Sequence, residues 1–183
     1  MIHNGDRLEN PVTGEVLVFH RTSDETNGEA VLVETIVRPD GFVAAAHVHP
    51  HQTERFEVVE GLVGLRVGEK EILASPGDVA VVPEGTPHRF WNAGNGVARF
   101  LCEVRPALQF ESLIETMFTL AVEGKTNRKG MPNPLRLAVI AKAHFDTVRL
   151  PFPPARVQRA ALVLAAPLGK ALGYRPTLTP SEA

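Results

Sequence analysis

The segment HVHPHQTERFEVVEG, residues 47–61, gathers side chains that can bind a metal ion. His47 and His49 stand on alternate positions, so in a β-strand both imidazoles point to the same face, with Cβ atoms roughly 7 Å apart. Pro50 and the polar residues after it predict a turn that brings Glu54 back beside the pair on an antiparallel strand. Two imidazoles and a carboxylate then form a set of metal ligands, whereas an isolated HxH pattern is also compatible with a solvated sheet edge.

A fourth candidate ligand, His88, lies in the segment GDVAVVPEGTPHRFWN, residues 77–92. Gly77 starts an apolar strand, Pro83 ends it and Gly85 permits a tight turn. His88 therefore begins the next strand, with its imidazole free to face the interior of the sheet structure.

The elements that must position these side chains are mainly β from about Glu15 to Arg105. Short runs rich in β-branched and aromatic residues alternate with turn signals such as RPDG, SPGD, PEGTP and NAGNG, which is typical of an antiparallel sandwich or barrel. The expected strands are EVLVFHR, AVLVETIVR, FEVVE, LVGLRV, DVAVV, HRFWN and VARFLCEV.

After Pro106 the apolar residues recur at three- and four-residue spacing, which predicts about three helices. Their apolar faces must be buried, either as a cap on an open barrel end, against an outer sheet face or in a dimer interface. We therefore divide the chain into a β-barrel domain, residues 1–106, and a helical extension, residues 107–183. The expected helical segments are 111–124, 134–148 and 154–173, with Gly124 and Gly173 as C-terminal caps.

Two motifs in the β region resemble those of the cupin superfamily, and the resemblance covers about residues 12 to 106. The first cupin motif is a glycine, five residues, HxH, three or four residues, a glutamate, six residues and a glycine. This chain meets it with Gly41, His47, His49, Glu54 and Gly61.

The second cupin motif is a glycine, five residues, PxG, two residues, a histidine, three residues and an asparagine. Together with the helical tail, the two motifs make the chain similar to uncharacterised single-domain bacterial cupins. The residues that meet the second motif are Gly77, Pro83, Gly85, His88 and Asn92.

The resemblance implies a mainly β fold, the double-stranded β-helix or cupin jelly-roll barrel, followed by the C-terminal helices. It also implies one divalent transition metal ion on His47, His49, Glu54 and His88. Three imidazoles and a carboxylate suit iron, manganese, nickel, copper or zinc better than magnesium or calcium. Four protein ligands in an octahedral shell leave two positions for water, substrate or dioxygen.

Two classes of function fit such a site. One is a metal-dependent oxygenase or dioxygenase that acts on a small apolar or aromatic molecule, and the other is a non-catalytic cupin that binds or senses a small molecule. Two further residues are candidates for the ligand pocket. His51 is expected in the turn at the barrel mouth, and Phe90, which shares its strand face with His88, is expected in an apolar pocket wall.

The composition limits the binding partners and the cellular compartment that we expect for this protein. A formal charge of −2, with acids and bases spread along the chain, provides no basic stripe for nucleic acid. The single cysteine, Cys102, excludes an intramolecular disulfide, and no apolar run reaches the roughly 20 residues that span a bilayer. The N-terminus shows no secretory signal, so we expect a cytoplasmic protein without membrane contact and, from the resemblance, a homodimer.

Overall fold

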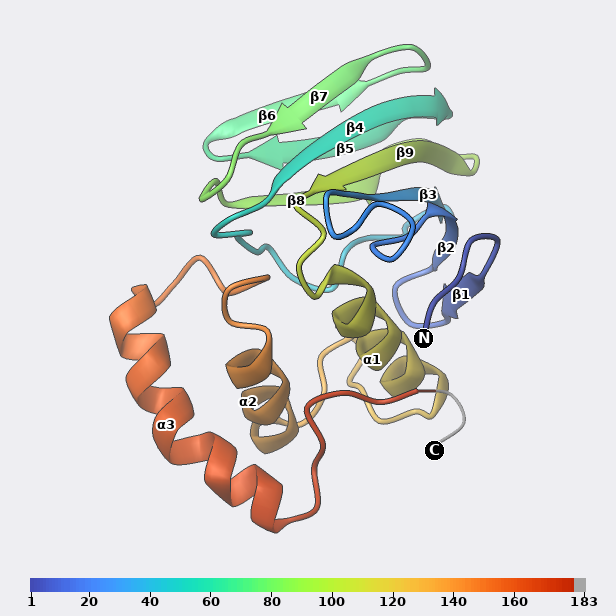
Figure 1. Cartoon of the computed structure of the whole chain (residues 1–183). Helices are drawn as coiled ribbons and strands as arrows, with labels where there is room; N and C mark the ends of the chain where they lie inside the picture. The colour runs from blue at the N-terminus through green and yellow to red at the C-terminus, as the bar shows by residue number, and fades with distance from the viewer. Residues whose placement is uncertain (180–183) are drawn as a thin grey trace.

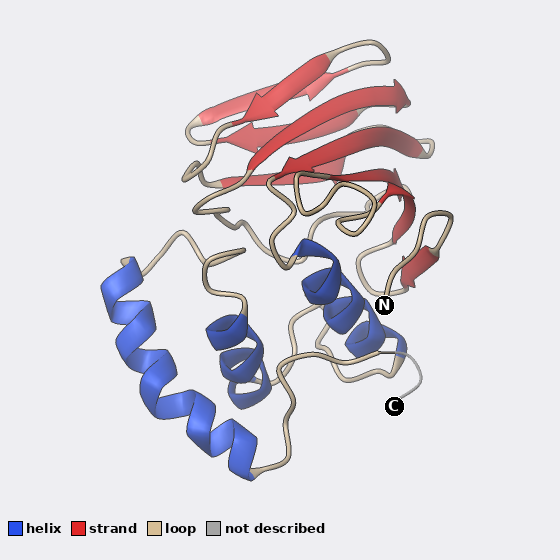
Figure 2. Cartoon of the chain, viewed as in Figure 1, coloured by secondary structure: helices blue, strands red, loops and turns tan. Residues whose placement is uncertain are grey.

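The β-strands form the upper part of the molecule and three helices lie together beneath one end of them, as Figures 1 and 2 show. The structure is a computed structural model, and it describes residues 1–179. All of the strands precede the helices in the chain, as the sequence predicts.

The strands within the described residues pair in two antiparallel sheets, a six-stranded one in the order β1-β2-β3-β9-β4-β7 and a three-stranded one in the order β6-β5-β8. Their bounds are β1 Arg7–Asn10, β2 Glu15–Arg21, β3 Val31–Val37, β4 Thr53–Glu60, β5 Val63–Val67, β6 Lys70–Ala74, β7 Val79–Val82, β8 His88–Asn92 and β9 Ala98–Arg105.

The barrel core lies between the two sheets and follows the two-residue period of the strands. In β9, the side chains of Phe100, Cys102 and Val104 are buried, while the residues between them are more exposed. The rings of Phe56 and Phe90 lie 5.5 and 5.1 Å from the ring of Phe100 and fill the space between the sheets. The predicted fold class, a mainly β cupin-type barrel followed by helices, is confirmed.

Two strands, β1 and β6, were not among the expected runs. Both lie at the edge of a sheet, and their sequences, RLEN and KEILA, carry charges at positions that remain largely exposed. Edge strands often carry charged residues that prevent pairing with other chains, so they lack the apolar alternation that identifies inner strands.

The helices are α1 Phe110–Val122, α2 Pro134–Ala143 and α3 Ala155–Ala171. Gly124 and Gly173 follow α1 and α3 with φ angles of 67° and 81°, which confirms them as C-terminal caps. The expected second helix was too long, because α2 ends at Ala143 rather than at residue 148. Arg149 instead pairs with Val48, which precedes β4, through two backbone hydrogen bonds of 2.9 and 3.0 Å.

Several contacts join the helices to the barrel and to one another. The Glu111 carboxylate at the start of α1 accepts hydrogen bonds from the backbone N–H and the hydroxyl of Ser23. Between α1 and α2, the hydroxyl of Ser112 lies 2.9 Å from His144 Nε2, and Leu113, Leu120 and Ile140 form a second small apolar core.

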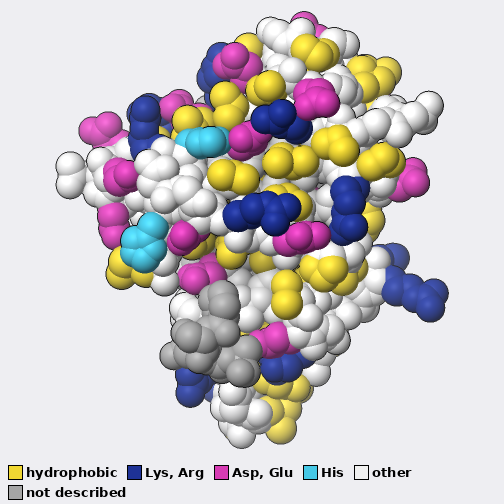
Figure 3. Space-filling model, turned by 90° about the vertical axis from the view of Figure 1, so that its right-hand side faces the viewer, with side chains coloured by type: hydrophobic (Ala, Val, Ile, Leu, Met, Phe, Trp, Pro, Cys, Tyr) yellow, Lys and Arg dark blue, Asp and Glu magenta, His cyan; other side chains and the backbone are white. Residues whose placement is uncertain are grey.

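The surface of the barrel mixes charged and apolar side chains, as the face in Figure 3 shows. On the outer side of β9, Arg99 forms ion pairs with Glu34 and Glu60. None of the helices within residues 1–179 is long and apolar enough to cross a membrane. Five large apolar side chains of α3 and its C-terminal cap are exposed: Val157, Val163, Leu164, Leu168 and Leu172.

The close packing of α3 on α2 depends on Gly169. A Cβ atom at this position would lie 2.5 Å from the carbonyl oxygen of Leu135 and 2.6 Å from a methyl group of Val139. We expect Gly169→Ala to lower the free energy of unfolding by about 1–3 kcal/mol, because the overpacking outweighs the better helix propensity of alanine. Denaturant unfolding measures this change.

The matched control is Gly96→Ala, because a Cβ atom on Gly96 would meet no other described atom within 4 Å. Equal unfolding midpoints for wild type and Gly169→Ala would contradict the close contact between α2 and α3.

Candidate metal centre

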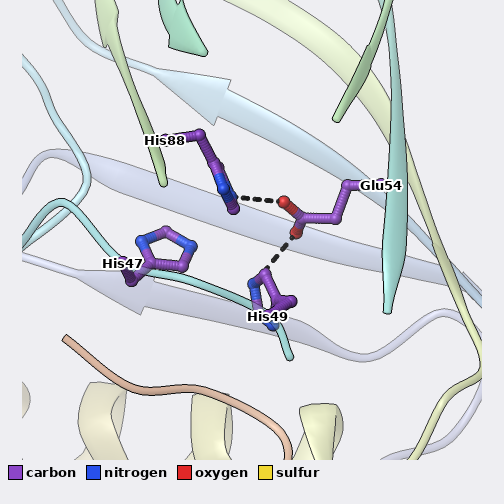
Figure 4. Close-up of side chains that lie close together, drawn as sticks. All are labelled: His47, His49, Glu54 and His88. Atoms are coloured by element: carbon purple, nitrogen blue, oxygen red, sulfur yellow. Dashed lines mark ion pairs between the residues drawn. The ribbon is translucent and has the colours of Figure 1, made fainter. Parts of the chain in front are cut away.

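The four predicted metal ligands lie together at the end of the barrel that faces the helices (Figures 1 and 4). One nitrogen or oxygen atom from each of His47, His49, Glu54 and His88 lies within 4.8 Å of the others. Glu54 comes from β4 of the six-stranded sheet and His88 from β8 of the three-stranded sheet, so the cluster spans both sheets.

Backbone pairing places the histidines. His47 and His88 are opposite each other in an antiparallel bridge with N–H···O distances of 3.0 and 2.9 Å. His49 follows His47 by two residues, and its ring lies 4.9 Å from the ring of His47. On β4, Glu54 has the parity of the buried Phe56, so its carboxylate points inward to the histidines.

The hydrogen bonds of the three imidazoles fix which nitrogen carries the proton. Nδ1 of His47 lies 2.9 Å from the carbonyl oxygen of Ala45, and Nδ1 of His88 lies 3.0 Å from that of Thr86. Nδ1 of His49 lies 2.7 Å from the carbonyl oxygen of Thr147. Because a carbonyl oxygen only accepts, each Nδ1 donates, and each Nε2 of a neutral ring keeps its lone pair.

The Nε2 atoms of His49 and His88 lie next to the Glu54 carboxylate in a buried space. His49 Nε2 lies 3.4 Å from one carboxylate oxygen and His88 Nε2 lies 2.6 Å from the other (Figure 4). Both nitrogens and Oε2 of Glu54 nevertheless have no well-directed hydrogen bond among the described residues. Buried polar atoms without partners are costly, and a cation at the shared point would satisfy them together. The residues therefore fit a metal ion.

The charge states of His47 and Glu54 suit ligation. Burial, together with the neighbouring imidazoles of His88 and His49, lowers the pKa of His47 to about 3, so this ring is neutral at physiological pH. Burial acts to raise the pKa of Glu54, but the imidazoles of His49 and His88 outweigh it and lower that pKa to about 2. The carboxylate is therefore ionised, which is the form that binds a cation.

Gln52 supports the cluster from behind, and its role was not predicted from the sequence. Its buried side-chain oxygen lies 2.9 Å from His49 Nδ1, and its side-chain nitrogen donates to the carbonyl oxygens of Pro106 and Ala107 at 2.8 and 2.9 Å. Since Thr147 also contacts His49 Nδ1, the orientation of this ligand depends on residues beyond the barrel strands.

A cavity of about 1010 Å³ lies between the barrel end and the helices, and His47 and His49 are part of its wall. This volume is at the upper end of the range for small-molecule sites. The apolar side chains come mainly from the three helices and from the segments between them. They include Phe110, Leu113, Met117, Leu137, Ile140, Phe145 and Leu162.

The cavity also contains a carboxyl group that was not predicted as a site residue. Glu15, at the start of β2, lines the cavity and is only 6% exposed. Burial raises the pKa of Glu15 to about 7, although a 2.5 Å hydrogen bond from the Thr13 hydroxyl opposes this effect. Sequence parity offers a weak signal, because Glu15 shares its strand face with the buried Leu17 and Phe19.

The two predicted pocket residues lie away from this cavity. His51 is exposed in the bend before β4, which agrees with its expected place in a turn. Phe90 is half-buried and packs on Phe56 and Phe100 inside the barrel, and neither His51 nor Phe90 belongs to the cavity wall. A role for either residue in ligand binding stays a prediction.

We expect Glu15→Gln to be more stable than wild type at pH 8 and to match it near pH 4. The folded state keeps the Glu15 proton up to about pH 7, whereas the unfolded chain releases it near pH 4.5, so wild type loses stability as the pH rises through this window. At pH 8 the free energy of unfolding of Glu15→Gln should exceed that of wild type by roughly 3 kcal/mol. Unfolding midpoints measured across this pH range test it.

Glu69→Gln, at an exposed turn position, is the control and should show no such pH-dependent gain. If the free energies of unfolding of Glu15→Gln and wild type differed by the same amount from pH 4 to pH 8, Glu15 would not be a buried carboxyl group without a compensating partner.

Comparisons with known proteins agree with the motifs and the fold. Residues 33–104 match the family model for the cupin domain. Oxidoreductase OpS7 of Beauveria bassiana is 51% identical over 45 residues, which are 24% of this chain and 15% of that protein. The structure of a predicted oxalate decarboxylase from Thermotoga maritima aligns with a TM-score of 0.50 and 20% identity over 55% of this chain and 90% of its own.

A sugar phosphate isomerase from a cupin superfamily, from Silicibacter pomeroyi, aligns with a TM-score of 0.45 and 26% identity over 52% of this chain and 62% of its own. Each of the two alignments leaves nearly half of this chain uncovered. The family match, the barrel topology and the converging histidines and glutamate lead to one assignment. Residues 33–104 are a cupin domain.

Proposed function

We propose that this protein is a metal-dependent oxygenase that acts on a small apolar or aromatic molecule bound between the barrel and the helices. The proposal rests on two residues that belong both to the candidate metal site and to the cavity wall. His47 and His49 belong both to the cluster that fits a metal ion and to the apolar cavity of about 1010 Å³. A molecule in the cavity therefore lies next to the ligand set.

His47, His49, Glu54 and His88 would hold one divalent ion, and iron, manganese, nickel or copper would support redox chemistry. Such an ion, when bound, supplies activation of dioxygen or polarisation of a substrate oxygen. The protein keeps the three imidazoles in one tautomer through the carbonyl groups of Ala45, Thr147 and Thr86. The ligand lone pairs are thus oriented before any ion arrives.

The cavity wall binds the substrate and excludes water. Phe110 of α1 packs 6.4 Å from the His49 ring and also lines the cavity, so an apolar surface borders the ligand set directly. Lys125 and Arg149 are the cations of the wall within the described residues. Lys125 pairs with Glu123 at 2.7 Å and Arg149 lies 5.9 Å from the Phe145 ring, so both charges have partners within the protein.

The curated relative supports redox chemistry. Oxidoreductase OpS7 carries that class in its name and shares 51% identity with 45 residues of this chain. The match spans only 15% of that protein, so it supports the proposed class of chemistry and no particular reaction.

We also propose that the chain divides at residue 106 into a barrel domain and a helical extension, and that two copies form a homodimer. The exposed apolar side chains of the α3 region, among them Leu164 and Leu168, are available for a contact between two copies. Size measurement in solution tests the homodimer.

The metal proposal predicts the effect of removing two ligands at once. We expect the His47→Ala/His88→Ala double variant to lose most of the metal that wild type carries, because two of four donor atoms are gone. The fold should persist, since neither residue belongs to the apolar core between the sheets. Mass spectrometry of metals and circular dichroism measure the two effects.

His20→Ala is the matched control, because His20 is partly exposed and forms an ion pair with Glu34 away from the cluster. Full metal occupancy in the double variant would show that these histidines are not the ligands.

The oxygenase proposal predicts oxygen consumption that depends on substrate. Protein purified without added metal should contain a redox-active metal, and it should consume dioxygen with members of a panel of phenols and diketones. The double variant should consume none above background.

Zinc-loaded or metal-free protein that gains thermal stability from panel members without consuming dioxygen would contradict the oxygenase. That result would support the alternative, a non-catalytic cupin that binds or senses a small molecule.

A further inference from the structure

A second polar position in the cavity is formed by Glu15 and its cross-strand neighbour Asn10. The two residues are directly opposite in the β1–β2 pair, and both are buried and line the cavity. Directly opposite residues present their side chains to the same face of a sheet. A carboxyl and an amide thus adjoin each other in a wall that is otherwise mainly apolar.

The Glu15 carboxyl has little to compensate its burial within the protein. The Thr13 hydroxyl donates to one of its oxygens at 2.5 Å, and among residues 1–179 no ion pair includes Glu15. The Asn10 side-chain oxygen accepts from the backbone N–H groups of Val12 and Thr13, which holds the turn before β2. A buried carboxyl without a cation reduces stability, so a packing role does not explain it.

Glu15 is distant from Glu54, one of the four candidate metal ligands. Strands β3 and β9 separate β2 from β4, which corresponds to roughly 14 Å across the sheet at ordinary strand spacing. Glu15 is level with Ala98 of β9, whereas Glu54 is level with Val104, an offset of roughly 20 Å along the strand. One small polar group of a ligand cannot reach both sites.

We propose that Glu15 binds a hydroxyl group of the apolar cavity ligand, at a distance from the metal centre. The inference rests on the proposed function, because it requires that the cavity holds a ligand. A hydroxyl both donates and accepts a hydrogen bond, so it complements a carboxyl group in either protonation state. The cavity ligand is then an elongated apolar molecule, such as an alkyl-substituted phenol or alcohol, with its hydroxyl at Glu15.

The test compares two probes that differ by one group, 4-butylphenol and 4-butyltoluene. The phenol carries a hydroxyl where the hydrocarbon carries a methyl group of similar size. Calorimetry or NMR titration of the full chain gives the affinity ratio, defined as the affinity for the phenol divided by that for the hydrocarbon. The ratio is measured in metal-free protein and in zinc-loaded protein, because a hydroxyl at the metal centre would bind only the second form more tightly.

We expect Glu15→Leu to lower the affinity ratio at least about tenfold in metal-free protein, which is the effect of one hydrogen bond in a buried site. Glu15→Gln should keep most of the ratio, because its amide retains an acceptor and the hydrogen bond from Thr13. Unfolding curves establish that both variants are folded, and Glu15→Met replaces the leucine variant if that variant does not fold.

Three results would overturn the inference. An unchanged affinity ratio in folded Glu15→Leu, or a ratio that responds to zinc and not to Glu15, would exclude hydroxyl binding by this residue while leaving the cavity as a ligand site. Wild type that binds neither probe would contradict the proposed ligand class of the cavity itself, and the role of Glu15 with it.

Discussion

The convergence of three imidazole nitrogens and one carboxylate on a single buried point is the interaction on which the rest of the structure depends. Each Nδ1 faces a carbonyl oxygen, so protons on the rings are directed away from this point and lone pairs are directed toward it. Without a cation, the arrangement leaves buried polar atoms unsatisfied. The two sheets and the apolar core between them supply the rigidity that keeps these groups together.

The sequence predicted this cluster because its geometry is mostly local. Alternation in a strand places His47 and His49 on one face, and the turn at Pro50 returns Glu54 beside them. The inner strands were also predictable, since their apolar periodicity comes directly from burial on one face. The edge strands β1 and β6 and the early end of α2 were not, because an exposed edge has no such period and the end of α2 reflects pairing of Arg149 with Val48, far away in the chain.

The supporting residues could not be predicted for a related reason. Gln52 contacts His49 and donates a hydrogen bond to a backbone oxygen more than 50 residues away in sequence. The Nδ1 atom of His49 contacts the carbonyl oxygen of Thr147, which is 98 residues away in sequence. No spacing rule links such pairs. Glu15 shares its strand face with the buried Leu17 and Phe19, but Val16 on the other face is buried as well, so the strand pattern indicates the interior face only weakly.

These long-range contacts join the helical part of the chain to the candidate metal centre. The segment after α2 pairs with Val48 and contacts His49 through Thr147, while α1 and α2 form much of the cavity wall. A displacement of Thr147, in the segment after α2, would also change the hydrogen bond that orients His49. The cavity wall and the orientation of His49 thus share one stretch of backbone, whereas Glu15 lies on β2, on the barrel side of the cavity.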